Sequence, residues 1–384
     1  MEEETGMTDN EVRYGLAGVL ADDTAVSKVM PEINALTYRG YKVQDLATQC
    51  RFEEVAYLIW NGDLPDAKAL DAFNALEKSQ RGLSQDVQSV MRLFNHDAHP
   101  MDTLRTAISF LGQEDSTTDD SSPAGLYDKA IRLYAKIPEI VAADFRLRNG
   151  KEPIAPTDDL AFSENFFHMC FGEVPSAETV KCFDISMTLY AEHSFNASTY
   201  SARAIASSTS DIYSAVTGAV GSLKGPLHGG ANEAVMHMLK EVGSPANARD
   251  WMLDALATKK KIMGFGHRVY RFGDSRVPTM TDAYKKMVDV IDSDEARAYW
   301  EMSQTLDKTM VGEKGIYPNL DFPAGPAYYL MGFEIPMFTP IFVISRITGW
   351  TAHVIEQLGN NKLVRPLSNY TGPEQRDVVG ISSR

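Results

Sequence analysis

The sequence predicts a mainly α-helical protein. Along most of the 384 residues, apolar side chains recur at steps of three and four, which is the spacing of one helix face. A first helix is expected over residues 43–62, because Asn61-Gly62 followed by Pro65 supplies a stop. Strand-like alternation is confined to residues 15–29 and 363–365, which is too little for a parallel sheet.

The same helical spacing continues to the end of the chain. At roughly 150 residues per domain, the length suggests two to three domain-sized units. Residues 113–123 are polar and acidic and predict a surface loop. Further helices are expected, in order, over residues 66–78, 84–93, 100–111, 126–149, 159–170, 176–193, 210–223, 231–241, 247–258, 277–290, 294–310 and 338–358.

Composition narrows the function classes. Lys and Arg number 37 against 52 Asp and Glu, a net charge of −15, which disfavours nucleic acid and anionic membranes as partners. Cys50, Cys170 and Cys182 are far apart, so neither a disulfide framework nor a cysteine zinc site is expected. The acidic first residues do not resemble a signal peptide, and no window is apolar enough to span a membrane. We expect a cytoplasmic protein.

Common catalytic motifs are missing, and attention moves to histidines between small residues. There is no GxxxxGK[ST], no GxGxxG after a strand and no GxSxG. His228 lies in Gly225-Pro-Leu-His-Gly-Gly230, just before an expected helix. Small neighbours allow a ligand to approach the backbone, and a helix N-terminus favours a neutral imidazole that donates a hydrogen bond. A turn histidine bonded to backbone carbonyls is the structural alternative.

His267 stands in a similar setting, Gly264-Phe-Gly-His-Arg268. Its surroundings are basic, which suggests a small polyanionic ligand such as a phosphorylated cofactor, although a solvated basic face would have the same composition. The basic residues are Lys259, Lys260, Lys261, Arg268, Arg271 and Arg276.

Asp321 follows Pro318-Asn-Leu, where loss of solvent would raise the pKa of its carboxyl group towards that of a useful base. A helix cap is the alternative role for this residue. His193 lies in a polar stretch, and Arg346 and Arg365 stand beside apolar sequence, which suggests buried contacts with carboxylates. Internal salt bridges explain both arginines equally well.

The remaining histidines have no comparable setting. His353 and Glu356 could face a metal ion from one helix, but no third ligand is apparent. We therefore expect no metal and take these histidines as core or surface residues: His96, His99, His168, His237 and His353.

Seven segments together resemble the citrate synthase family, in its order and at similar spacing, over about residues 15–376. They are Leu36-Thr-Tyr-Arg-Gly-Tyr41, His99-Pro-Met-Asp-Thr-Leu-Arg105, Glu192-His-Ser-Phe-Asn-Ala-Ser-Thr199, Gly225-Pro-Leu-His-Gly-Gly-Ala-Asn-Glu233, Gly264-Phe-Gly-His-Arg-Val-Tyr270, Pro318-Asn-Leu-Asp321 and Ile344-Ser-Arg346.

The resemblance implies a helical homodimer with a large and a small domain and an active site in the cleft between them. The large domain would comprise residues 1–222 and 327–384, and the small domain residues 223–326. Arg365 would reach the site of the partner subunit.

The family reaction joins an acyl-CoA to oxaloacetate without a cofactor or metal. By resemblance, Asp321 is the base, His228 stabilises the enol of the thioester and His267 polarises the oxaloacetate carbonyl. The carboxylates of oxaloacetate would be held by His193, Arg276, Arg346, Arg365 and, less securely, Arg81. The CoA-binding stretch would be Lys261, Ile262, Met263, Gly264 and Phe265.

Tyr190 and Leu320 resemble the branch of the family that makes 2-methylcitrate from propionyl-CoA, whereas many dedicated citrate synthases have His and Val there. Some small citrate synthases share the tyrosine. The expected function is therefore 2-methylcitrate synthesis that also accepts acetyl-CoA. The alternatives are a dedicated citrate synthase and a non-catalytic helical CoA-binding module. One methylene changes binding by only about 1–3 kcal/mol, so overlap between the two thioesters is expected.

Overall fold

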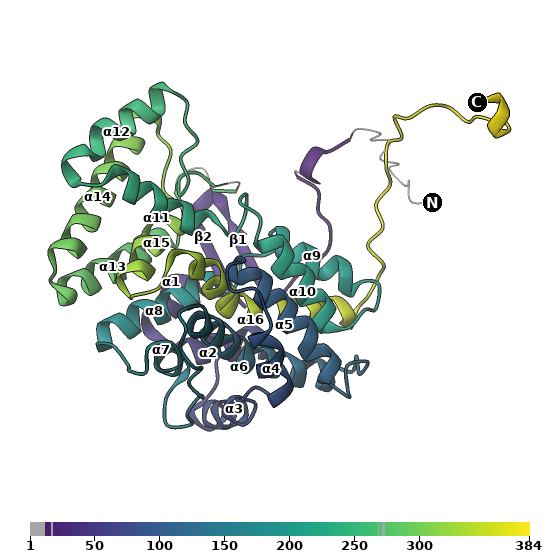
Figure 1. Cartoon of the computed structure of the whole chain (residues 1–384), viewed down its shortest axis with the longest axis horizontal. Coiled ribbons are helices and arrows are strands. Elements are labelled where there is room, and N and C mark those ends of the chain that lie inside the picture. The colour runs from purple at the N-terminus through teal and green to yellow at the C-terminus, as the bar shows by residue number, and fades with distance from the viewer. Residues whose placement is uncertain (1–11, 17, 268, 271–272) are drawn as a thin grey trace, which may run out of the picture.

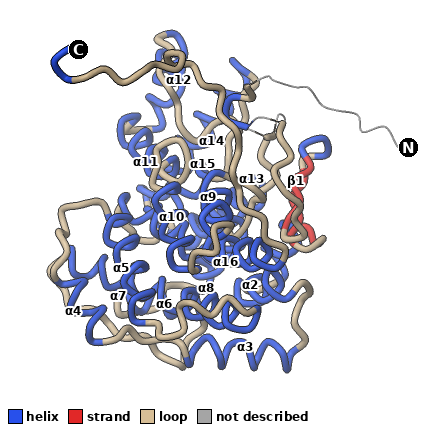
Figure 2. The backbone as a smooth tube through the Cα atoms, turned by 90° about the vertical axis from the view of Figure 1, so that its right-hand side faces the viewer, coloured by secondary structure: helices blue, strands red, loops and turns tan. Residues whose placement is uncertain are grey.

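The computed structural model describes residues 12–16, 18–267, 269–270 and 273–384. Helices form most of the structure, and loops connect them (Figures 1 and 2). The small antiparallel sheet consists of β1 (Ser27–Met30), β2 (Ala35–Tyr38) and β3 (Tyr41–Lys42). The expected strand in residues 15–29 thus begins only at Ser27, and the expected strand at 363–365 does not form.

The first half of the chain contains helices α1 to α8. The predicted helix over residues 43–62 is in fact two helices, because the backbone is extended at Cys50 and Arg51 and the Glu54 carboxylate accepts a hydrogen bond from the Arg51 amide at 2.6 Å. The helices are α1 (Val43–Gln49), α2 (Phe52–Asn61), α3 (Ala67–Ser79), α4 (Gln85–Arg92), α5 (Pro100–Glu114), α6 (Pro123–Arg148), α7 (Phe162–Phe171) and α8 (Ala177–Tyr190).

The second half contains two helices that the sequence pattern missed, α9 and α15. For the α15 segment, Pro323 and Pro326 favour a turn over a helix. Pro323, however, lies in the first helical turn, where an N–H group would have no intrahelical acceptor, so its absence costs no hydrogen bond. The helices are α9 (Ala197–Ala206), α10 (Ile212–Leu223), α11 (Ala231–Val242), α12 (Pro245–Ala257), α13 (Val277–Ile291), α14 (Asp294–Lys314), α15 (Asp321–Leu330) and α16 (Phe338–Gly359).

Helix α16 is the centre of the core. It is buried from Phe338 to Val354 and packs against α6, α8, α9 and α10. Helices α11 to α15 pack on one another at one side of the molecule (Figure 1). The end of α8, the start of α15 and the middle of α16 therefore meet where these two groups of helices join. None of the described helices is long and apolar enough to cross a membrane.

Candidate active site

A short backbone pairing brings His267 close to Asp321. The Gly266 amide donates to the Tyr317 carbonyl at 2.8 Å, and the Asn319 amide donates to the Gly264 carbonyl at 2.9 Å. Gly264 has a φ of +84°, and a Cβ there would lie 2.4 Å from a methyl group of Val235. Only glycine accommodates both the backbone conformation and this contact. The glycine-rich sequence thus serves to pack the His267 loop against the start of α15.

Asp321 is the first residue of α15, and its carboxylate accepts a hydrogen bond from the Tyr190 hydroxyl at 2.7 Å. Burial raises the pKa of Asp321 to about 6, although Tyr190 and Arg276 lower it in part. A carboxylate with this pKa is a stronger base than an exposed one and remains ionised at neutral pH. Asp321 is thus not the cap of α15, because Leu320 holds the N-cap position and no side-chain cap hydrogen bond forms. Its buried setting is compatible with the expected role as a base.

His228 lies just before α11 in the chemical state that the sequence suggested. Burial, with a smaller effect from Arg346, lowers the pKa of His228 to about 4, so the ring is neutral at pH 7. The Ser198 amide donates to its Nε2 at 3.3 Å, and the Ser198 hydroxyl lies 2.8 Å from the same nitrogen. Since Nε2 accepts, the proton is on Nδ1. His228 can thus donate a hydrogen bond from Nδ1 without carrying charge.

His267 has the opposite tautomer. Its Nδ1 accepts hydrogen bonds from the amides of Val269 at 3.0 Å and Tyr270 at 3.3 Å, which leaves the proton on Nε2. Burial, followed by the charge of Arg276, lowers the pKa of His267 to about 4. Its ring centroid lies 5.1 Å from that of His193. Two neutral histidines therefore each have one nitrogen free to donate.

His193 and Arg346 present buried donors beside these rings. Among the described residues, His193 Nε2 and Arg346 Nη1 have no hydrogen-bond partner. Burial, and then Arg276, holds the pKa of His193 well below its usual value. The guanidinium of Arg346 lies 4.7 Å from the ring centroid of Phe342, which also packs on Tyr190. Buried donors of this kind suit the carboxylates of a small dianion.

Arg276 completes the cationic side and reveals a residue that the sequence did not single out. Both oxygens of Asp274 accept hydrogen bonds from the Arg276 guanidinium, at 2.9 and 2.7 Å, and both side chains are buried. The pKa of Arg276 is raised because Asp274 outweighs the effect of burial. Asp274 thus orients Arg276. An acid two residues before the arginine was the only signal in the sequence.

The basic stretch around residue 261 immediately precedes the loop that carries His267. Lys261 is exposed, whereas Ile262 packs on the core and the ring centroid of Phe265 lies 4.6 Å from that of Phe322. Lys260 is paired with Glu241 at 2.5 Å. Arg268 and Arg271 lie outside the described residues.

Two predicted ligand contacts are not brought to the cluster. Arg81 is bound by Glu77 one turn earlier in α3, with a shortest N–O distance of 2.8 Å, and lines a separate hollow of about 410 Å³. Its guanidinium is therefore committed to a local ion pair, and the structure gives the oxaloacetate role of Arg81 no support. Arg365 is exposed in the segment after α16.

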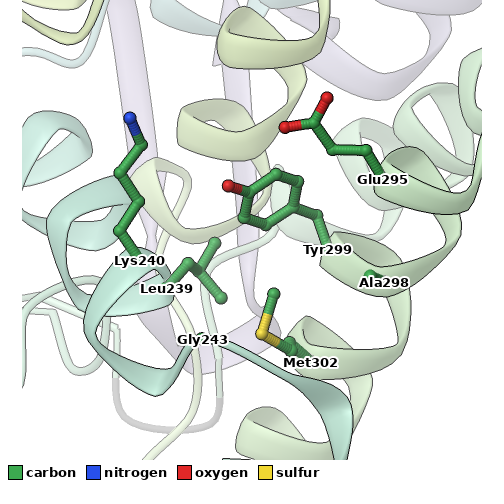
Figure 3. A pocket seen from close by; sticks show the side chains of 7 residues that line it. All are labelled: Leu239, Lys240, Gly243, Glu295, Ala298, Tyr299 and Met302. Carbon is green, nitrogen blue, oxygen red and sulfur yellow. The ribbon is translucent and has the colours of Figure 1, made fainter.

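Another hollow, of about 390 Å³, also lies away from these histidines (Figure 3). It opens between α11 and α14, with Leu239 and Met302 at its floor and Lys240, Glu295 and Tyr299 around it. Among the described residues, no group of three or more His, Cys, Asp or Glu could hold a metal ion.

The groups gathered here are those of an enzyme that forms an enol and adds it to an acceptor. A raised-pKa carboxylate can take a proton from carbon, and neutral histidines can stabilise the developing oxyanions. Buried cations beside them can hold an anionic acceptor. Fold and site together define a helical enzyme of carbon–carbon bond formation.

Comparison with known proteins gives the family. The model described as "Citrate synthase, C-terminal domain" matches residues 15–367. The chain belongs to the citrate synthase family and is an acyltransferase. It is 56% identical over 370 residues to a 2-methylcitrate synthase of Mycobacterium tuberculosis strain H37Rv, covering 96% of this chain and 93% of the relative. A citrate synthase of Mycolicibacterium smegmatis is 53% identical, with 98% and 100% covered.

A solved structure agrees with this assignment. The citrate synthase of Thermoplasma acidophilum, in a ternary complex with carboxymethyl coenzyme A and oxaloacetate, superimposes with a TM-score of 0.91 at 28% identity. The match covers 97% of this chain and all of that one.

Proposed function

We propose that the protein is a 2-methylcitrate synthase, which condenses propionyl-CoA with oxaloacetate and water to give 2-methylcitrate and CoA, and that it also accepts acetyl-CoA. The observation that carries this proposal is the hydrogen bond from Tyr190 to Asp321 at 2.7 Å. This contact supports the proposal, because Tyr190, the residue typical of the 2-methylcitrate branch, would then lie beside the proposed base, where the acyl chain must lie during proton removal.

In the proposed reaction, the Asp321 carboxylate takes a proton from the carbon next to the thioester carbonyl. His228 donates from Nδ1 to the thioester oxygen and stabilises the enol or enolate. His267 donates from Nε2 to the keto oxygen of oxaloacetate as the new carbon–carbon bond forms. Water then hydrolyses the thioester of the product and releases CoA. Lys261 to Phe265 would bind CoA.

The oxaloacetate carboxylates would be held by His193, Arg276 and Arg346. These side chains are buried, and His193 Nε2 and Arg346 Nη1 have unused donor capacity among the described residues. A buried guanidinium gains most when it meets a carboxylate, because the free energy lost by desolvation is then compensated. The thioester and the dianion would thus approach the same point from opposite sides.

We further infer that residues 223–326 form a small domain that closes on the rest of the chain. Many contacts cross this boundary, including the packing of α13 on α8, and two of the hydrogen bonds among them lie next to the proposed oxaloacetate residues. The Gln44 amide donates to the Ser275 carbonyl at 2.8 Å, and Arg276 donates to the Leu189 carbonyl at 3.3 Å. Both of these contacts adjoin Arg276, so substrate binding and closure would be linked.

The reaction needs no metal or other cofactor, since the CoA thioester is a substrate. We place it in the cytoplasm, because a reducing compartment suits three free cysteines, Cys50, Cys170 and Cys182.

Substrate choice tests the proposal. Steady-state kinetics at saturating oxaloacetate should give turnover with both thioesters. In the double variant Tyr190→His, Leu320→Val, the ratio of kcat/KM for propionyl-CoA to that for acetyl-CoA should fall about tenfold to a hundredfold, because one methylene is worth about 1–3 kcal/mol. Tyr190 and Leu320 are both buried, at 2% and 1% exposure, so they can shape an enclosed acyl pocket.

A wild-type preference for acetyl-CoA above about a hundredfold would favour the dedicated citrate synthase, for which the similarity to the Mycolicibacterium smegmatis enzyme is the supporting observation. An unchanged ratio in the variant would assign acyl specificity to other residues. The absence of CoA release with either thioester would leave only a CoA-binding module.

The segment after α16 supports a homodimer. Val364 still donates to the Ser207 hydroxyl at 3.0 Å, but the chain then leaves the body in both views (Figures 1 and 2). It carries exposed apolar side chains, among them Leu367 at 91% and Tyr370 at 75% exposure. Burial of such side chains against a second copy would be favourable. We propose that Arg365 thereby enters the partner's site.

Mixing two inactive variants tests this arrangement. Arg365→Ala and Asp321→Ala chains should each lose activity, and a heterodimer would contain one site in which both residues are intact. After subunit exchange, we expect activity to recover to about a quarter of the wild-type value, since half of the chains pair as heterodimers with one working site of two. Exchange verified by mass spectrometry without recovery would place Arg365 in the site of its own subunit.

A further inference from the structure

One face of α16 packs against the end of α8 and the loop that carries His193. The Arg346 Nε donates to the Tyr190 carbonyl at 2.6 Å. A Cβ on Gly349 would lie 2.5 Å from the Ala191 carbonyl oxygen, so the loop approaches the helix backbone directly. This face is a stripe of residues at spacings of four, three and four: Phe342, Arg346, Gly349 and His353.

His353 ends this stripe with a buried hydrogen-bonded contact to Glu192. Its Nε2 lies 2.9 Å from the Glu192 carboxylate, and both side chains have no exposed surface. The same carboxylate oxygen accepts hydrogen bonds from the Ser27 hydroxyl at 2.9 Å and the Ser194 amide at 2.5 Å. Ser194 has a φ of +52°, a left-handed conformation that non-glycine residues adopt only when the surroundings hold it. Glu192 thus fixes the backbone on both sides of His193.

Glu192, Glu356 and Arg203 face His353, and Arg203 Nη1 lies 3.2 Å from its Nδ1. Burial alone would lower the pKa of His353, but Glu192 and Glu356 outweigh it and the pKa is raised; Arg203 opposes them in part. Arg203 itself pairs with Glu356 at 2.7 Å and with Asp22 at 2.9 Å. These described charged groups form one network, buried at His353, Glu192 and Arg203 and exposed at Asp22, which ties the N-terminal segment, α9 and α16 to the His193 loop.

Glu192 also supplies negative charge behind Arg346. It is the group that most opposes the effect of burial on the pKa of Arg346, which falls to about 10. No ion pair within 4.0 Å joins these two described side chains, so Glu192 does not occupy the guanidinium donors. Within the described part of the chain, Arg346 Nη1 and His193 Nε2 are among the buried polar atoms without a hydrogen-bond partner. The Glu192–His353 pair thus contacts the backbone next to His193, and the charge of Glu192 acts on Arg346.

We propose that Glu192 and His353 are positioning residues for oxaloacetate: their buried pair holds His193 and Arg346 in the geometry that receives the two carboxylates. This inference rests on the proposed function. Neither residue touches the substrate. A loosened pair would let the Ser194 turn relax and shift His193, and a displacement of about 1 Å in a binding group can weaken binding or catalysis by up to about a hundredfold.

Two amide variants of His353 separate positioning from general damage. In His353→Gln, the amide nitrogen takes the place of Nε2 and can still donate to Glu192. In His353→Asn, the shorter amide lies near the place of Nδ1 and leaves Glu192 without this donor. Calorimetry should show oxaloacetate binding within about threefold of wild type for the glutamine variant, and about tenfold to a hundredfold weaker for the asparagine variant. The Kd for CoA alone should stay within about threefold in both.

The matched control is His237→Asn on the exposed face of α11, which should bind both ligands normally. Equal oxaloacetate Kd values for the glutamine, asparagine and wild-type proteins would overturn the positioning role. Wild-type protein that binds no oxaloacetate would overturn the proposed function as well. If the asparagine variant does not fold, Ser27→Ala carries the test: it should weaken oxaloacetate a few-fold and spare CoA, and an unchanged oxaloacetate Kd would refute the proposal.

Discussion

Replacing Asp321 with asparagine is expected to lower turnover by at least about a hundredfold, the usual effect of losing a general base. Asparagine keeps the shape of the side chain and can still accept the Tyr190 hydrogen bond through its amide oxygen. The loss would thus report the missing base rather than a collapsed site. The measurement is steady-state CoA release, with thermal unfolding as the check on folding.

Asp282→Asn provides the control, because Asp282 is an exposed acid whose side chain lies 3.4 Å from Lys286 on α13. This variant should keep wild-type turnover. Turnover of Asp321→Asn within about tenfold of wild type would remove Asp321 from the proposed mechanism.

The pH profile gives a second view of the same residue. The base must be ionised, and the pKa of Asp321 is about 6, so kcat/KM for the thioester should fall about tenfold per pH unit below pH 6. The pKa values of His228 and His267 are both about 4, so these rings stay neutral across that range. The acid limb would therefore report Asp321 alone, and it should vanish from the residual activity of Asp321→Asn.

Replacing His228 with alanine should lower turnover by about a hundredfold to a thousandfold, the range found when one oxyanion donor is removed. The lost group is the neutral Nδ1 donor that Ser198 defines by donating to Nε2. The Kd for oxaloacetate should change little, because the buried donors proposed for it belong to His193, Arg276 and Arg346.

The comparison variant is His237→Ala, which removes an exposed histidine of α11. Near-normal turnover in His228→Ala would show that the imidazole is only a turn residue. A matching loss in His237→Ala would instead point to damage of the helix that follows His228.

The local sequence indicated the candidate site residues, but not the side chains to which they are hydrogen-bonded. Glycines and prolines around His228, His267 and Asp321 mark places where the chain turns sharply, and such marks are visible without a structure. The mostly helical class followed from the apolar spacing. Helix α15 was missed because proline disfavours a helix interior. Pro323 lies in the first turn, where proline is tolerated, but Pro326 lies inside the helix, which forms all the same because it is packed in the core.

Hydrogen bonds between residues far apart in the chain could not be predicted from such local sequence signals. His353 is a core histidine, one of the two positions expected for it, but the sequence did not reveal its partner Glu192, 161 positions earlier. Ser198 sets the tautomer of His228 from 30 positions away. Neither pairing leaves a periodic or compositional signal, because only tertiary packing, such as that of α16 on α8, brings these side chains together. The residues that position His193 and His228, namely Glu192, His353 and Ser198, can therefore be found only in the folded structure.

The backbone pairing between Gly264–His267 and Tyr317–Asn319 has an evolutionary consequence. It fixes the separation of His267 from Asp321 through main-chain bonds, which point mutations of side chains leave in place. Tyr190 belongs to a different helix, α8, and meets Asp321 through its hydroxyl alone. If Tyr190 shapes the acyl pocket as proposed, mutations at position 190 would change the choice of thioester while the spacing of His267 and Asp321 stays the same. Related enzymes could then evolve from propionyl-CoA to acetyl-CoA, or the reverse, while His267 and Asp321 keep their relative positions.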